Sequence, residues 1–409
     1  MLNEKEKLEE IIRLGNEVTE IKDLDLLLEK ILSKAREIVR ADAGSIYVRD
    51  EDRLNFTHSQ NETLSKKLPP GKKLIYTTFS LPINNNSIAG YVANTGKILN
   101  IPDVYELSDD VPYGFSKSFD QLANYRSKSM LTVPFKTSRG DIVGVLQMIN
   151  AQDERGTIIP FAPGDEPLVA HFANDAAIAL ERAQMTRAII LRMISMAELR
   201  DPKETGAHVN RVAGYSVEIY ENWAKRKMIS QRTIDDKRDV LRMAAMLHDV
   251  GKVAISDLIL KKPARLTDEE FQKMKTHTFL GAKLFANPKS DFDEAAAEVA
   301  LNHHERWDGK GYPGFIDLST GDPLSGYEIE AGRPRPKKGE EIPLFGRIVA
   351  LADVYDALSS SRCYKEPWDE GKVLGIITEE AGKHFDPEMV EVFFSCLEVI
   401  QNIRNRYLG

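Results

Sequence analysis

The residue types that could do chemistry in this 409-residue sequence point first to metal binding. Five of its eight histidines fall within residues 208–304, together with a His-Asp pair and a His-His-Glu run. Imidazole is the commonest metal ligand, and histidines gain little from crowding unless they coordinate something. The candidate ligands are Glu204, His208, His248, Asp249, His277, His303, His304 and Asp353.

The composition of this set indicates a catalytic rather than a structural metal site. It contains no thiolate, which favours iron first, with manganese and zinc as alternatives. Eight candidates are too many for one ion, so we expect two or three divalent ions. A carboxylate such as Asp249 can bridge two ions about 3.5–4 Å apart, which share one activated hydroxide and polarise a phosphoryl group. For any single member, the alternative is a hydrogen-bonded core histidine or a helix-capping carboxylate.

Apolar runs with helical character lead into two of the candidate positions. Residues 241–247 precede His248 and Asp249, and residues 345–352 precede Asp353. A helical bundle delivers ligands from buried helix faces to its interior in this way. We therefore expect residues 185–409 to form an all-α bundle around the candidate ligands.

The N-terminal part predicts a different architecture within an α+β multidomain protein. Residues 1–40 have the apolar spacing of a helix. Short β-branched segments at 45–48, 129–134 and 142–149 lie between turn signals, which is typical of an antiparallel sheet flanked by helices. The order of these pieces resembles a GAF domain over about residues 20–183, so we expect residues 1–183 to be a sensory domain with an N-terminal helix.

Small-ligand members of the GAF family often carry an Asn-Lys…Phe-x3-Asp-Glu signature. Here Asn150 is followed by Ala151, although Phe161, Asp165 and Glu166 match. The missing lysine argues against a cyclic nucleotide. A different small-molecule ligand, or a relay domain with an empty pocket, stays open.

Residues 165–200 predict one long helix that connects the two halves. Its apolar residues alternate by four and three, as in the seam of a coiled coil. We expect a parallel homodimer through this helix, and the alternative is packing against its own domain. The seam residues are Phe172, Ala176, Ala179, Ala183, Thr186, Ile190, Met193 and Ala197.

Two motifs make the C-terminal half specific. The run 248–252 reads His-Asp-Val-Gly-Lys, and the run 303–313 reads His-His-Glu-Arg-Trp-Asp-Gly-Lys-Gly-Tyr-Pro. Over about residues 195–400 the sequence resembles the HD-GYP family of cyclic di-GMP phosphodiesterases, a branch of the HD metal-dependent phosphohydrolases. The resemblance implies hydrolysis of cyclic di-GMP to linear pGpG, with a second cleavage to GMP left open.

The resemblance also implies roles for individual residues. His208, His248, Asp249 and Asp353 match the core ligand set, His277, His303 and His304 a second metal position, and Glu204 a third. Asp249 and Lys252 are the expected catalytic residues, although a salt bridge to a metal-ligating carboxylate is the alternative role for Lys252. The expected substrate contacts are Arg362, Lys365, Lys252 and Asp308.

The segment 315–341 departs from the family pattern. It makes the connection after Pro313 about twenty residues longer than usual, and its prolines and glycines exclude a regular helix. A lid, a partner surface, a substrate filter and a passive insertion are all compatible with it.

Composition limits the remaining functions. The net charge of −8 opposes binding to a nucleic-acid polymer, and two cysteines without a CxxC pattern fit a reducing cytoplasm. We expect no signal peptide and no membrane span. The alternatives are hydrolysis of another cyclic dinucleotide such as 3',3'-cGAMP, a catalytically weak cyclic di-GMP receptor, and a structural metal protein.

Overall fold

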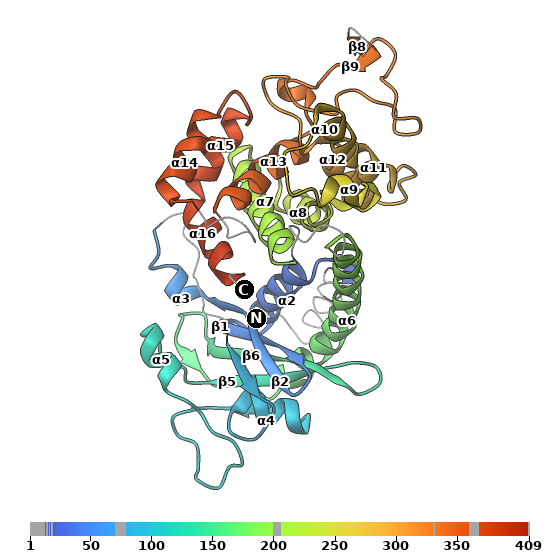
Figure 1. The fold of residues 1–409 in the computed structure, drawn as a ribbon. Helices are drawn as coiled ribbons and strands as arrows, with labels where there is room; N and C mark the ends of the chain where they lie inside the picture. Colours follow the sequence, from blue (N-terminus) through green and yellow to red (C-terminus); the bar gives the residue numbers. More distant parts are fainter. Residues whose placement is uncertain are drawn as a thin grey trace. The chain divides into compact units, whose positions relative to one another are not determined.

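The computed structural model describes residues 19–69, 79–198, 206–329, 332–359 and 368–407, with the isolated positions 13, 15 and 17. The chain divides into two compact units, Met1–Arg187 and Ala188–Gly409, which are described one at a time (Figure 1).

The N-terminal unit is built on a seven-stranded antiparallel sheet. Its main path has the order β3-β2-β1-β6-β5-β4, and β7 pairs with β6. The predicted segments at 45–48, 129–134 and 142–149 are confirmed as strands, whereas the other four strands were not predicted. The strands are β1 (Ala41–Asp50), β2 (Arg53–Asn61), β3 (Ser80–Pro82), β4 (Leu99–Ile101), β5 (Met130–Lys136), β6 (Ile142–Gln152) and β7 (Ile158–Ile159).

Helices cover both faces of this sheet. Helices α2 (Leu24–Val39) and α6 (Asp165–Glu198) pack on the face that carries Ile46 and Leu146. The next residue of β1, Tyr47, and the preceding residue of β6, Val145, point to the opposite face, where α4 (Ile88–Thr95) packs. This follows from the two-residue repeat of a strand. The short helices α3 (Glu62–Ser65) and α5 (Ser118–Ala123) complete the unit.

The helix predicted over residues 1–40 needs a correction. Among its described residues, 21–23 are not helical. Asp23 caps α2 instead, because its Oδ1 accepts the backbone N–H groups of Asp25 and Leu26, both at 3.0 Å. A cap of this kind satisfies amide groups that the first turn of a helix leaves without partners.

The long connecting helix is present as α6, and residues 199–200 lie outside the described part of the chain. Four of the predicted seam residues are buried in the core of the N-terminal unit, against α2 and the sheet. For this part of the helix the structure has the alternative arrangement, packing against the chain's own domain. The four residues are Phe172, Ala176, Ala179 and Ala183.

The C-terminal unit is the expected helical bundle, with a core built around α7, α8 and α13. It differs from an all-α domain by one small hairpin, β8 (Glu328–Ile329) and β9 (Arg333–Pro334), within the 315–341 loop. Its helices are α7 (Gly206–Arg226), α8 (Gln231–Met246), η1 (Val250–Ala254), α9 (Asp257–Leu260), α10 (Asp268–Lys275), α11 (His277–Lys283), α12 (Asp291–Asn302), η3 (Gly339–Glu341), α13 (Leu344–Ser359), α14 (Glu370–Glu379), α15 (Pro387–Ser395) and α16 (Leu397–Arg406).

The 315–341 loop has a packed base within this unit. Ile316 is buried against α11 and α12. The rings of Phe315 and Tyr327 stack at 4.1 Å, and the Arg335 guanidinium lies 4.7 Å from the Phe315 ring centroid. The β8–β9 hairpin lies at the outer end of the loop (Figure 1). The base of the insertion is therefore part of the domain's packing.

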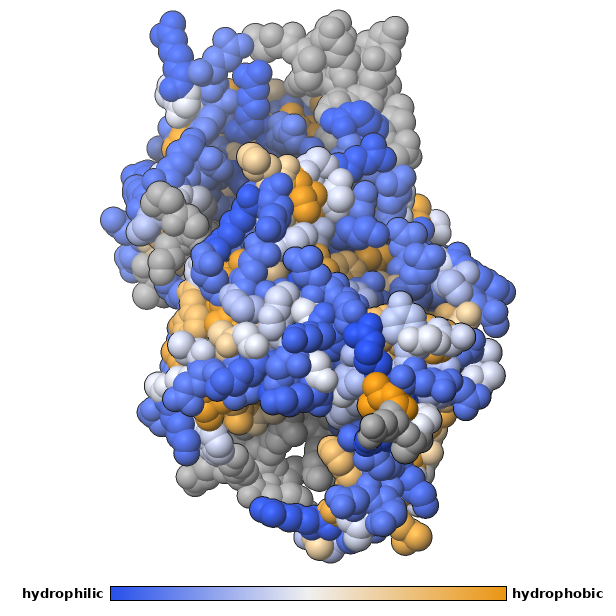
Figure 2. Space-filling view, turned by 90° about the horizontal axis from the view of Figure 1, so that it is seen from above, coloured by the Kyte–Doolittle hydropathy of each residue, from blue (hydrophilic) through white to orange (hydrophobic). Residues whose placement is uncertain are grey.

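The surface seen in Figure 2 is mostly hydrophilic, with hydrophobic side chains in small, separate groups. Among the described helices, none combines the length and apolar character that crossing a bilayer requires.

Candidate metal centre

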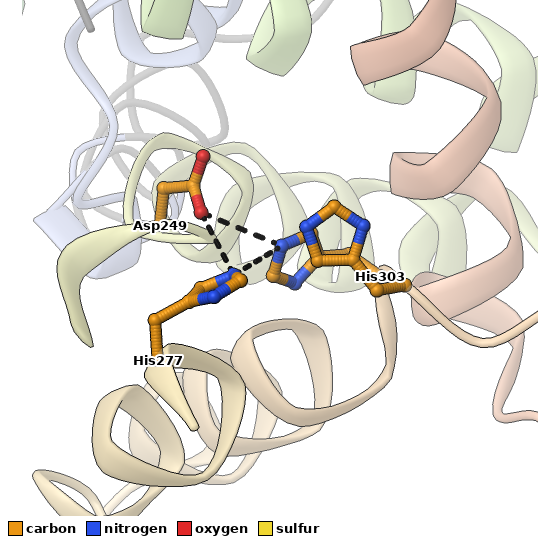
Figure 3. A group of neighbouring side chains, drawn as sticks. Asp249, His277 and His303 are labelled. Atoms are coloured by element: carbon orange, nitrogen blue, oxygen red, sulfur yellow. Dashed lines mark hydrogen bonds and ion pairs between the residues drawn. The ribbon is translucent and has the colours of Figure 1, made fainter. Parts of the chain in front are cut away.

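Three imidazoles and one carboxylate meet where three helices end or begin. Asp249 follows α8, His277 opens α11, and His303 and His304 follow α12. Asp249 Oδ1 lies 3.1 Å from His277 Nε2 and 3.6 Å from His303 Nε2, and these two nitrogens are 3.5 Å apart (Figure 3). His304 completes the group, whose ligand atoms all lie within 4.8 Å of one another.

A second group lies directly beside the first. Asp353 Oδ1, on α13, is 3.6 Å from His208 Nε2 on α7 and 3.9 Å from His248 Nε2. Asp249 connects the two groups, because its Oδ1 faces the first group while its Oδ2 lies 3.3 Å from His248 Nε2. A carboxylate with one oxygen toward each group has the geometry of a bridging ligand.

The hydrogen bonds of the imidazoles fit metal ligands. Where Nδ1 faces a carbonyl oxygen, which only accepts, Nδ1 carries the proton and a neutral ring presents the lone pair of Nε2. Neutral His277 Nε2 and Asp249 Oδ1 are then two acceptors 3.1 Å apart, which a cation between them would stabilise. The donor set therefore fits divalent ions. The Nδ1 atoms of His248 and His277 donate to Ala245 and Met274, each at 2.8 Å, and that of His303 to Val299 and Ala300, each at 3.1 Å.

Electrostatics favour the neutral form of His303 and His304 and the ionised form of Asp249. Burial lowers the pKa of His304 well below its ordinary value, and neighbouring imidazoles lower it further. Burial also lowers the pKa of His303. Although burial alone would raise the pKa of Asp249, the Lys252 ammonium holds it well below the usual range. Neutral imidazoles around a carboxylate are the forms that bind a cation.

Asp356 positions the ligand His208. Its carboxylate accepts from His208 Nδ1 at 2.8 Å and from Arg211 Nε and Nη2 at 2.7 and 2.9 Å. Although burial would raise the pKa of Asp356, these hydrogen bonds lower it to about 2. Asp356 had no predicted role. Its spacing of three residues from Asp353, which places both on one side of α13, was the available signal.

Gly251 allows the His-Asp segment to approach α11 closely. A Cβ atom at this position would lie 1.9 Å from the carbonyl oxygen of His277 and 2.4 Å from the amide nitrogen of Gly281. Any side chain here would push α11 away, and His277 with it. The glycine is thus a condition for the short distance between Asp249 and His277.

Glu305 holds the turn that follows the histidine pair. Its buried carboxylate accepts the backbone N–H of Gly314 at 2.6 Å and that of Lys337 at 3.2 Å. Burial raises its pKa to about 7. One side chain thereby ties both ends of the 315–341 loop to the segment that carries two ligands. This positioning role was also missed, although Glu305 belongs to the quoted motif.

The other predicted site residues lie outside the two ligand groups. Lys252 Nζ is 2.7 Å from Asp249 Oδ2, which is the salt bridge given as the alternative to a phosphate contact. Asp308 pairs with Arg306 at 3.3 Å and accepts the N–H of Lys310 at 3.1 Å. The remaining predicted positions, Glu204, Arg362 and Lys365, fall outside the described residues.

In the N-terminal unit, Asn150 has a structural role. Its Oδ1 accepts the N–H of Lys128 at 2.6 Å, and its Nδ2 donates to Tyr125 Oη and to the carbonyl oxygen of Arg126, both at 2.8 Å. These hydrogen bonds occupy the side-chain amide of the asparagine that matches the GAF signature. A cavity of about 300 Å³ lies beside β4, with Asp103 and Glu106 in its wall.

The family comparisons agree with this architecture. A model described as HD domain matches residues 205–358, a second HD-domain model matches residues 330–389, and a GAF-domain model matches residues 23–180. The chain therefore carries a GAF domain followed by an HD domain. The HD domain implies binding of divalent metal, which the two ligand groups fit.

Individual relatives match slightly more than half of this chain. A "Cyclic di-GMP phosphodiesterase" of Vibrio cholerae is 40% identical over 240 residues, 56% of this chain and 44% of the relative. A "3'3'-cGAMP-specific phosphodiesterase 2" of the same organism is 33% identical, over 53% of this chain and 35% of the relative. The solved GAF domain of a Coxiella burnetii phosphoenolpyruvate-protein phosphotransferase matches with a TM-score of 0.35 and 19% identity, over 46% of this chain and 99% of that one. This chain spans less than half the length of the two curated relatives.

Proposed function

We propose that this protein is a metal-dependent phosphodiesterase that hydrolyses cyclic di-GMP to linear pGpG, under the control of its GAF domain. The observation that carries the proposal is Asp249, which offers one oxygen to each of two adjoining ligand groups. Centres of two ions suit the cleavage of phosphodiesters. The likeness to a relative named cyclic di-GMP phosphodiesterase supports the choice of substrate.

In this proposal the chain's own residues bind the metal ions and hold the ligand side chains in position. When bound, the ions would supply Lewis acidity toward a water molecule and a phosphoryl oxygen. Lys252 would hold the bridging carboxylate of Asp249 ionised, from 2.7 Å. Seven residues would hold two ions, iron before manganese or zinc: His208, His248, Asp249, His277, His303, His304 and Asp353.

Further roles stay predictions from the sequence. Glu204 would contribute to a third ion. Arg362, Lys365, Lys252 and Asp308 would contact substrate, and a second cleavage would give GMP. A cytoplasmic location and a small-molecule ligand of the GAF domain, for which the cavity beside β4 offers a place, belong to the same proposal.

A second candidate function is hydrolysis of 3',3'-cGAMP. A metal centre acts on the phosphate and does not distinguish the bases. One relative is named "3'3'-cGAMP-specific phosphodiesterase 2". A catalytically weak receptor for cyclic di-GMP is the third candidate. The close approach of the seven candidate ligands speaks against it.

Metal removal and substrate competition test the proposal. Protein purified without oxygen is expected to hold two or three iron ions per chain and to convert cyclic di-GMP to pGpG. Dialysis against a chelator should abolish turnover, and added iron should restore it, because the ions supply the Lewis acidity of the centre. With cyclic di-GMP and 3',3'-cGAMP at equal concentration, chromatography should show the first consumed faster. One zinc ion per chain and no turnover of either dinucleotide would contradict the proposal.

We also infer a parallel homodimer, through a different side of α6 from the predicted seam. Four large apolar residues of this helix are exposed and recur at intervals of seven, four and seven residues. Intervals of four and seven residues separate a and d positions of a coiled-coil repeat. This exposed stripe consists of Ile178, Met185, Ile189 and Met196.

A charge within the stripe is expected to dissociate the dimer. Ile189→Glu would place like charges opposite each other in a parallel pair, so light scattering should report the mass of one chain. Ser195→Glu, exposed on another side of the same helix, is the matched control and should leave the dimer intact. A wild-type protein that is monomeric at every concentration tested would refute the inference.

A further inference from the structure

A row of aromatic rings leads from the first ligand group to the surface. The rings of His304 and Tyr312 stack with centroids 4.9 Å apart and an interplanar angle of 27°. Tyr312 meets Phe271 of α10 edge to face, at 6.4 Å and 78°. Phe271 is 43% exposed. The row therefore connects the half-buried candidate ligand His304 with solvent in two steps.

Lys275 adds a positive charge to this row. Its ammonium lies 4.8 Å from the ring centroid of Phe271 and 5.2 Å from that of Tyr312. Residues four apart share one side of a helix, so Phe271 and Lys275 face Tyr312 together from α10. The next residue but one is the candidate ligand His277. The cation and both rings are thus fixed close to the centre.

A flat anionic ligand would suit these three side chains. A single exposed aromatic residue is ordinary in itself. Here the exposed ring adjoins a half-buried tyrosine and an ammonium group, a combination that offers stacking and phosphate binding at one place. Metal ligands cannot distinguish bases, so contacts to a base must come from residues at the rim.

We propose that Phe271, Lys275 and Tyr312 form a subsite for a purine base of the substrate and the phosphate attached to it. The subsite rests on the proposed function, because it serves the same centre. The base stacks on the exposed ring of Phe271. The Lys275 ammonium exchanges part of its contact with the rings for the phosphate oxygens.

Steady-state kinetics with two diesters test the subsite. Cyclic di-GMP carries purines, whereas methyl p-nitrophenyl phosphate is a phosphodiester without one. Phe271→Ala should raise the KM for cyclic di-GMP. The kcat/KM for cyclic di-GMP divided by the kcat/KM for methyl p-nitrophenyl phosphate should therefore fall about tenfold. Phe271→Trp keeps a stacking surface and should restore the ratio. Lys273→Ala, which removes an exposed lysine of the same helix, is the matched control and should leave the ratio unchanged.

The outcomes separate the subsite from the proposed function. A wild-type protein that hydrolyses cyclic di-GMP, with a Phe271→Ala variant of unchanged ratio, would overturn the subsite alone. A metal-loaded wild-type protein that hydrolyses neither diester would overturn the proposed function and the subsite with it.

Discussion

Replacing Asp249 by alanine is expected to lower kcat/KM for cyclic di-GMP by far more than the roughly 10–100-fold typical of residues that merely support metal ligands. Its two oxygens face both ligand groups, at 3.1 Å from His277 Nε2 and 3.3 Å from His248 Nε2. The variant should therefore bind fewer ions as well as lose turnover.

Metal content and turnover should be measured on the same Asp249→Ala preparation, with circular dichroism as a check of the fold. The matched control is Asp257→Ala, which removes an exposed aspartate whose partner Lys261 lies 3.3 Å away. An exposed pair of this kind contributes little to stability. Full hydrolysis by an Asp249→Ala protein with wild-type metal content would rule out the assigned centre.

The sequence predicted those parts of the fold that have their own pattern. The strands β1, β5 and β6 are β-branched and long enough for their spacing to be recognised. The strands β3, β4 and β7 have only two or three residues and exist because a neighbouring strand pairs with them. The seam of α6 was ambiguous, since alanine packs equally well against a second copy or against the chain's own sheet.

For the candidate site, residue type predicted the members but not their supports. Seven of the eight proposed ligands meet in the structure. They could be predicted because clustered histidines, and His-Asp or Asp after an apolar helical run, are recognisable in a sequence. Asp356 had only its spacing from Asp353 as a signal, and Gly251 and Glu305 only their places in the 248–252 and 303–313 motifs, none of which indicated a supporting role. Their roles depend on contacts with residues distant in sequence, such as Asp356 with His208 or Glu305 with Lys337.

Asp356→Asn should strongly destabilise the C-terminal unit. It removes the charge that pairs with the buried Arg211 guanidinium at 2.7 and 2.9 Å. Loss of one partner of a buried ion pair costs about 3–5 kcal/mol of unfolding free energy, because the other charge stays buried. The hydrogen bond to His208 Nδ1 also weakens, so metal affinity should fall about 10–100-fold. Urea unfolding and metal titration measure the two effects.

A double variant separates stability from ligand positioning. Asp356→Asn combined with Arg211→Met leaves no unpaired buried charge, so the unfolding free energy should recover while metal affinity stays low. The folded-state pKa of about 2 lies below the ordinary 3.8, so the carboxylate's contribution is complete at neutral pH. It is lost only as the pH falls from about 4 to about 2. Wild-type metal affinity in the double variant would show that Asp356 serves the fold alone.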